Sequence, residues 1–188
     1  HRKLEPWVSN FSMIRIGIVL STEGGALKPM LIPFKFRMGN YFGKGDQIMS
    51  WIHVDDLARM IFYIADQKIS GIYNGVAPSP VSGKQLVATI AASNPGPYLQ
   101  FGAPEFILKL VFGEMSQAIL MSTKVSANKI LSKEFTFEYN EIKEAISKAK
   151  QNNQVAFNFL LDTFWNDVYA FQLKRTENEN DAEDITIQ

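Results

Sequence analysis

Residues 48–64 read IMSWIHVDDLARMIFYI, and this stretch decides the fold. Residues 48–54 are largely apolar and β-branched, which predicts an extended, buried segment. Two aspartates follow, Asp55 and Asp56, and either one is a good N-cap for a helix. The apolar residues after them recur at helical spacing, namely Leu57, Met60, Ile61 and Ile64. The stretch therefore predicts a strand that leads directly into an amphipathic helix.

The neighbouring segments supply further strands and helices. Residues 13–20 (MIRIGIVL) predict a buried strand, and residues 71–76 (GIYNGV) predict a second short one. Residues 27–36 contain two prolines and predict a short, broken helix. Residues 39–47 are rich in glycine and predict a loop or hairpin. Ser82 is expected to cap a further helix that ends before residues 95–97 (PGP).

The following part of the chain predicts small elements with little strand content. Helices are expected over residues 104–112 and 114–121, and a short apolar face over residues 125–131. Residues 135–139 alternate between apolar and polar, so that they could pair as an edge strand. Residues 141–149 predict a last short amphipathic helix.

Charge and pattern change near residue 148. Residues 148–188 hold four basic and seven acidic residues, whereas residues 1–147 hold 15 basic and 12 acidic ones. Apolar residues at helical spacing over 157–169 form the clearest helix pattern in the chain. Asn180 and Glu183 could form a capping box for another helix. We therefore expect one domain over residues 1–147 and a helical segment over residues 148–188.

The composition limits the possible functions. The 188 residues are 46% hydrophobic with a formal net charge of zero, which gives no general attraction to nucleic acid or to a membrane. The chain has no cysteine and two histidines, so disulfides, thiolate nucleophiles and typical zinc sites are excluded. The apolar runs are too short to cross a bilayer. These properties fit a cytoplasmic protein.

Several short sequence motifs, found in a fixed order, give the chain a family resemblance. They are residues 15–21 (RIGIVLS), 24–27 (GGAL), 30–34 (MLIPF), 50–57 (SWIHVDDL), 74–78 (NGVAP) and 112–114 (FGE). Over about residues 13–146 the chain resembles the C-terminal half of an atypical short-chain dehydrogenase/reductase of the NAD-dependent epimerase/dehydratase type. That group is described as nucleoside-diphosphate-sugar epimerase-like and carries a C-terminal domain of unknown function, here about residues 95–146.

The resemblance implies a fold and a chemistry. The implied fold is α/β: the C-terminal part of a Rossmann-like, NAD(P)-binding fold with a small α+β substrate-side domain, followed by a C-terminal α-helical segment. Intact relatives are expected to bind NAD or NADP and a small-molecule or nucleotide-linked substrate. By resemblance the cofactor side is formed by Val19, Leu20 and Ser21. The substrate side is formed by Arg15, Trp51 and His53. The alternative is that Asp55 or Asp56 caps the helix and His53 is structural.

Parts of the expected machinery are not found in this sequence. A dinucleotide site needs a Gly-x-x-Gly-x-x-Gly turn after the first strand, and the chain has none. We also expect the chain to lack the Tyr-x-x-x-Lys pair on which hydride transfer relies in the wider superfamily. The sequence begins with His1, which fits a start inside a longer reading frame. The chain is therefore expected to be truncated, inactive alone, and to bind no cofactor by itself.

Residues 156–188 carry a second resemblance, to region 2 of a sigma-70-type, extracytoplasmic-function sigma factor. The matching segments are residues 160–161 (LL), 165–169 (WNDVY) and 181–188 (DAEDITIQ). By resemblance RNA polymerase would dock on Asp181, Glu183, Asp184 and Gln188. The basic helix that reads promoter DNA in that family is missing, so no direct DNA binding is expected.

Three alternatives remain open at this point. The tail could be a helical hairpin that packs on the first domain. The two truncated halves could be adjacent genes joined by a frameshift or an assembly error. The chain could also be one subunit of a split reductase, in which case the strand over residues 15–20 would offer an apolar surface to its partner.

Overall fold

The computed structural model describes residues 11–21, 27–103 and 122–151. In chain order its first elements are β1 (Ser12–Ile16), β2 (Ile18–Leu20), α1 (Leu27–Leu31), the 3-10 helix η1 (Pro33–Phe36), β3 (Met38–Phe42), β4 (Ile48–Met49) and β5 (Trp51–His53). The remaining elements are α2 (Val54–Asp66), β6 (Gly71–Gly75), β7 (Val81–Ser82), α3 (Gly83–Ala92), β8 (Leu99–Ala103), α6 (Asn128–Leu131) and α7 (Ile142–Lys150).

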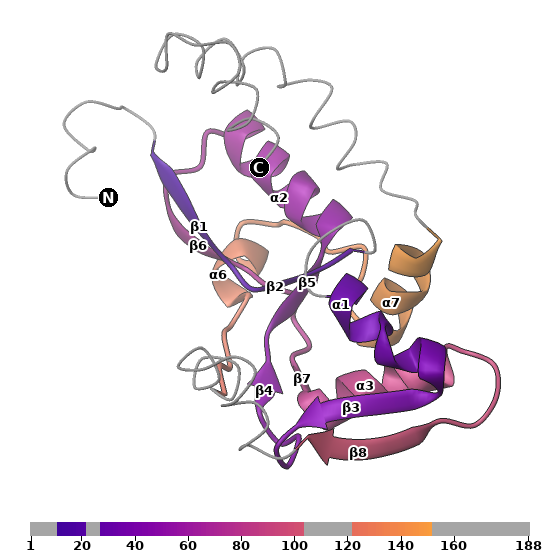
Figure 1. Cartoon of the computed structure of the whole chain (residues 1–188). Coiled ribbons are helices and arrows are strands. Elements are labelled where there is room, and N and C mark those ends of the chain that lie inside the picture. Colours follow the sequence, from indigo (N-terminus) through magenta and orange to yellow (C-terminus); the bar gives the residue numbers. More distant parts are fainter. Residues whose placement is uncertain (1–10, 22–26, 104–121, 152–188) are drawn as a thin grey trace, which may run out of the picture.

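The strand predicted over residues 13–20 is divided at Gly17. Before it, β1 pairs in parallel with β6, and after it, β2 pairs in parallel with β5. The N–H of Gly17 still donates to Gly75 O at 3.0 Å, whereas the next N–H, of Ile18, donates to Ser50 O at 2.9 Å. A single stretch of chain therefore changes partner strand at this glycine, as Figure 1 shows where β1 meets β2.

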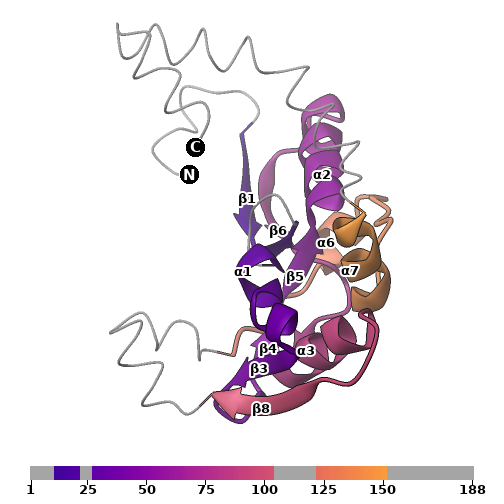
Figure 2. The same ribbon diagram turned by 45° about the vertical axis from the view of Figure 1, so that its right-hand side comes forward.

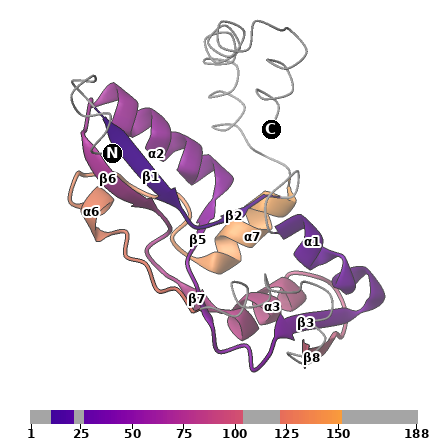
Figure 3. The ribbon, with the colours of Figure 1, turned by 60° about the vertical axis from the view of Figure 1, so that its left-hand side comes forward.

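The short β2–β5 pair separates two apolar cores. Successive side chains of a strand point to opposite faces, so Leu20 and Trp51 pack into one core and Val19 and Ile52 into the other. The α2 core lies among β1, β6, α2 and α6, and includes Met60, Ile64, Tyr73, Ile130 and Phe135. The α3 core lies among α1, α3 and α7, and includes Leu27, Phe34, Leu86, Ile90 and Ile146. Figure 3 shows these two groups of elements on either side of β2 and β5, and in Figure 2 α2 lies above β5 and α3 below it.

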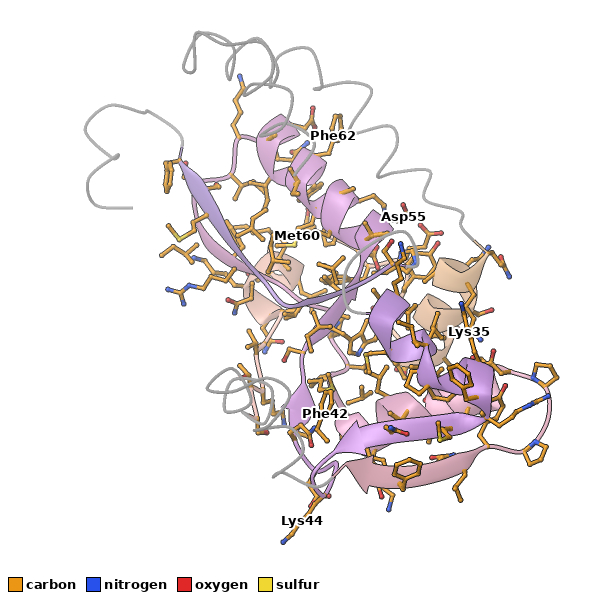
Figure 4. All side chains as sticks on the ribbon, in the orientation of Figure 1. Lys35, Phe42, Lys44, Asp55, Met60 and Phe62 are labelled. Carbon is orange, nitrogen blue, oxygen red and sulfur yellow. The ribbon has the colours of Figure 1, made fainter. Side chains whose placement is uncertain are left out.

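Helix α2 follows the apolar pattern that predicted it. Met60 is fully buried, whereas Phe62 is 41% exposed. In Figure 4 Met60 lies on the side of α2 that faces the strands, and Phe62 lies on the other side. The predicted cap is wrong: the N-cap is His53, and neither aspartate occupies that position. The two aspartates lie in the first turn, where the partial positive charge of the helix N-terminus favours acidic side chains.

Around α3 the structure confirms one prediction and corrects another. Ser82 caps α3 as predicted, by accepting the N–H of Gln85, and the Gln85 side chain completes a capping box. The loop or hairpin predicted over residues 39–47 is in part a strand, because β3 pairs in parallel with β8. Only the stretch after Phe42 turns, and it continues toward the N-terminus of α3, where Lys84 N–H donates to Gly45 O at 2.9 Å.

Residues 133–139 lie along helix α2 and reach its first turn before α7 begins. Residues 135–139 do not form the predicted edge strand. Their alternating pattern still holds as burial, because Phe135, Phe137 and Tyr139 are buried and the residues between them are exposed. α7 then packs on α3, and Lys150 Nζ donates to Asn94 Oδ1 at 2.7 Å and to Ser93 Oγ at 2.9 Å. The domain boundary predicted near residue 148 lies within the last turn of α7.

Candidate functional site

The ends of two parallel strands lie side by side at the centre of the molecule. The β2–β5 register pairs Leu20, the last residue of β2, with His53, the last residue of β5. Ser21 follows directly and is 5% exposed. In open α/β sheets, ligands bind outside the carboxyl ends of the strands. We call Leu20, Ser21, His53 and Tyr139 the strand-end cluster.

The imidazole of His53 has a defined orientation. Its Nδ1 accepts the N–H of Asp55 at 3.2 Å and so caps α2. A neutral imidazole that accepts at Nδ1 carries its proton on Nε2. The side chain is fully buried, and within the described residues Nε2 has no hydrogen-bond partner. The cluster therefore contains a buried N–H donor that is not committed to any described group.

Tyr139 covers one face of this imidazole. The two ring centroids are 4.2 Å apart, and the planes are inclined at 47°. The phenol hydroxyl donates to Glu138 Oε1 at 3.1 Å. Burial, followed by the hydrogen bond to Glu138, raises the pKa of Tyr139 to about 12. The phenol is thus protonated at neutral pH, and it is already engaged with a carboxylate of its own segment.

Asp56 holds Tyr139 in this place. Its carboxylate is fully buried and accepts the N–H of Glu138 at 2.8 Å and the N–H of Tyr139 at 2.9 Å. Arg59 Nη1 donates to the same carboxylate at 2.9 Å. Burial raises the pKa of Asp56 above its ordinary value, while the two backbone donors and Arg59 oppose this shift. The hydrogen-bonded carboxylate of Asp56 thereby connects the first turn of α2 to residues 138–139.

Two more side chains of α2 bind the same segment. Arg59 Nη2 donates to Thr136 O at 3.2 Å, and the Tyr63 hydroxyl donates to Lys133 O at 2.7 Å. Asp56, Arg59 and Tyr63 are three and then four residues apart, which places them on one face of the helix. That face of α2 therefore binds the backbone of residues 133–139.

The pH dependence of stability should report on His53. Burial lowers its pKa below the ordinary 6.5, against the opposing charges of Asp56 and Glu138. As the pH falls below 6.5 the unfolded chain takes up this proton first, so that stability is lost, by at most about 1.4 kcal/mol per pH unit. We expect His53→Asn, which keeps a capping acceptor but does not titrate, to lose less stability between pH 7 and pH 5. Urea unfolding at each pH measures this.

The only other histidine provides the control. His1→Gln should leave the pH dependence as it is in the wild-type chain, because the buried imidazole is still present. An equal loss of stability in the wild-type and His53→Asn chains over this range would contradict the assignment of the effect to His53.

The predicted site residues are brought together only in part. Leu20, Ser21 and His53 meet at the strand ends, and Val19 points into the α2 core. Trp51 is 1% exposed, and its Nε1 donates to Ser79 O at 2.8 Å, as a structural residue would. Arg15 is exposed on β1, opposite Asn74 of β6, away from the β2–β5 pair. The polymerase-docking residues Asp181, Glu183, Asp184 and Gln188 lie outside the described residues.

One expectation about the sequence was wrong. The chain does contain a Tyr-x-x-x-Lys spacing, formed by Tyr139 and Lys143. Two side chains four residues apart come close together when both lie in a helix, but Tyr139 precedes α7, whose N-cap is Glu141. Tyr139 is buried against His53, whereas Lys143 is exposed on α7. This pair thus lacks the geometry that a shared proton-transfer role requires.

Sequence reasoning missed the contact of Tyr139 with His53 and the role of Asp56 in holding Tyr139 there. The alternation of residues 135–139 does give Tyr139 as a buried residue, but no local pattern shows that it lies on His53.

In the described part of the chain, no group of three or more acidic or histidine side chains is placed to hold a metal ion. None of the helices described has the length and apolar character needed to cross a membrane.

Comparisons with known proteins agree with this architecture. The family DUF1731, a domain of unknown function, matches residues 103–149. An epimerase family protein of Staphylococcus aureus is 38% identical over 133 residues, which are 70% of this chain and 44% of that protein. The chain thus spans less than half the length of the curated relatives it matches.

Solved structures show the same likeness. The human epimerase family protein SDR39U1, crystallised with NADPH, aligns with a TM-score of 0.70 at 29% identity, over 75% of this chain and 48% of the human chain. A nucleoside-diphosphate sugar epimerase of Corynebacterium glutamicum aligns with a TM-score of 0.52 at 26% identity, over 89% and 35%. The fold is α/β and corresponds to part of the Rossmann-like fold of NAD(P)-binding epimerases and reductases. The sigma-factor resemblance gains no support from these proteins and stays a prediction.

Proposed function

We propose that this chain is the C-terminal, substrate-side portion of an NAD(P)-dependent epimerase-family protein. The observation that carries the proposal is the pairing of Leu20 with His53, which puts two strand ends at the edge where such folds bind ligands. Leu20 and Ser21 would border the nicotinamide, and His53 would face the substrate. The likeness to a human relative crystallised with NADPH supports this placement.

This portion alone is not expected to catalyse hydride transfer. Its sequence has no Gly-x-x-Gly-x-x-Gly turn, and the backbone N–H groups of such a turn are what hold a dinucleotide pyrophosphate. Bound NAD or NADP would supply hydride transfer in the whole protein. The residues described here would border the substrate and exclude water from it.

The two-stranded β1–β6 sheet supports the proposal that further strands complete it. Within the described residues β1 pairs with β6 alone, and Ile16 at the end of β1 is 54% exposed. Parallel sheets are found almost always with several strands and with both faces covered. We therefore propose that the free edge of β1 receives another parallel strand, either from the same polypeptide or from a complementing subunit.

Reconstitution tests this proposal. We expect the part of the Staphylococcus aureus relative that lies outside its match to this chain to form a 1:1 complex with it, measured by size-exclusion chromatography with light scattering. Ile16→Lys should weaken the complex at least tenfold, because a charge would be buried at the new strand contact.

Ile32 supplies the matched control, since it is 53% exposed but lies outside β1. Ile32→Lys should leave the complex intact. Two separate species at micromolar concentration, or equal effects of the two lysines, would count against a strand contact at β1.

A polymerase-docking role for the tail is the alternative from a different class. It rests on the sequence of residues 181–188 alone. Retention of core RNA polymerase on the immobilised chain, lost when Glu183 and Asp184 are reversed in charge, would favour it. Absence of retention would remove it.

A further inference from the structure

The strand-end cluster joins two parts of the chain that are more than eighty residues apart. His53 comes from the end of β5, and Tyr139 comes from the segment that matches a domain of unknown function. No described residue pairs with Nε2 of His53, although its imidazole is fully buried. An unpaired buried donor destabilises a fold and is uncommon in native proteins, so this one needs an explanation.

We propose that Tyr139 is a positioning residue for His53, and that it keeps the imidazole neutral with Nε2–H as a free donor at the strand ends. The ring of Tyr139 excludes water from one face of the imidazole. The N–H of Asp55 occupies Nδ1, which leaves the proton on Nε2. Residues 138–139 thus act on the site through the Tyr139 side chain, which need not touch the substrate.

The carboxylates around His53 favour its charged form, so the Tyr139 ring is needed to keep the imidazole neutral. Asp55 and Asp56 of α2 and Glu138 of the covering segment all carry carboxylates close to the imidazole, and Asp55 Oδ2 is 3.9 Å from Nδ1. Carboxylates favour the imidazolium, which would lose the Nδ1 acceptor and with it the cap of α2. The carboxylate of Asp56 accepts three donors, which reduces its hold on the imidazole proton. Burial under Tyr139 then favours the neutral form.

The free donor defines the chemistry of its ligand. A neutral Nε2–H is suited to an oxygen acceptor such as a sugar hydroxyl or an amide carbonyl. It would not attract a phosphate as an imidazolium does. This use of the donor rests on the function proposed above, whereas the state of the imidazole can be measured without any ligand.

Nuclear magnetic resonance of the full chain, with 15N-labelled imidazole, tests the inference. We expect the wild-type chain at pH 7 to show the neutral Nε2–H tautomer and a titration midpoint below 6.5. Tyr139→Phe keeps the covering ring and should leave tautomer and midpoint unchanged. Tyr139→Ala and Tyr139→Leu should raise the midpoint toward 6.5, more for alanine, because water reaches the imidazole.

Two controls separate positioning from a loss of structure. The Trp51 indole N–H, bonded to Ser79 O, should keep its native resonance in each variant that is compared. Lys150→Met removes the contact of α7 with Ser93 and Asn94 without touching His53, so it should leave the midpoint unchanged.

Three results would overturn the inference. They are an Nδ1–H tautomer in the wild-type chain, an unchanged midpoint in a folded Tyr139→Ala or Tyr139→Leu variant, or an equal rise in Lys150→Met. None of these outcomes depends on cofactor binding, so this inference and the proposed function can fail separately.

Discussion

Replacing Asp56 by alanine should destabilise the chain by about 3 kcal/mol, because two backbone N–H groups lose the buried carboxylate that accepts them. The substitution leaves the N–H groups of Glu138 and Tyr139 without an acceptor and Arg59 without its nearest carboxylate. Asp56 is fully buried, whereas the Arg59 side chain is 35% exposed, so the two backbone hydrogen bonds account for most of the loss and the ion pair for less. Urea unfolding followed by tryptophan fluorescence measures the change in free energy.

Asp66 of the same helix is the matched control for Asp56. It is exposed, and its carboxylate binds only the neighbouring Gln67 side chain among the described contacts. Asp66→Ala should change stability by no more than about 0.5 kcal/mol. If Asp56→Ala were as mild as Asp66→Ala, the carboxylate would not be what fastens residues 138–139 to α2.

Gly17→Ala should cost about 3 kcal/mol, at the upper end of what overpacking a core usually costs. A Cβ on Gly17 would lie 2.5 Å from Ser50 O and 2.7 Å from Val76 Cγ1. The carbonyl of Ser50 cannot move away freely, because it accepts the N–H of Ile18 at the point where the strand changes partner. We expect a lower urea midpoint together with faster amide exchange at Ile18.

Gly75→Ala provides the comparison within the same sheet. Its Cβ would meet only side-chain atoms first, at 3.0 Å from Ile14 Cγ2 and 3.3 Å from Leu57 Cδ1, and these can shift. It should therefore cost clearly less than Gly17→Ala. The reverse order would show that Gly17 is not a required point of close approach.

Local patterns predicted the elements that depend on neighbouring residues. The predicted cap Ser82 binds a residue only three positions away, and the apolar face of α2 follows from its own spacing. The same local reasoning gave a cap to Asp55 or Asp56. It failed because Nδ1 of His53 takes that position, while Asp56 is used in a contact with residues more than eighty positions away.

Pairing between distant segments was the harder part to predict. The strand β8 was not predicted, since residues 99–103 contain a glycine and become a strand only through parallel pairing with β3. Residues 135–139 alternate as a strand would, yet two of their N–H groups donate to a carboxylate in place of a neighbouring strand. The ring contact between His53 and Tyr139 depends on these tertiary hydrogen bonds, so no local sequence motif could predict it.

The most direct test of the central claim is a fluorescence titration of NADPH with the purified chain alone. A chain that supplies the substrate side but no phosphate-binding turn should give no saturable enhancement up to millimolar NADPH. Saturable enhancement by this chain alone would contradict the account, because the pyrophosphate would then be held by residues that we place outside the cofactor's phosphate site.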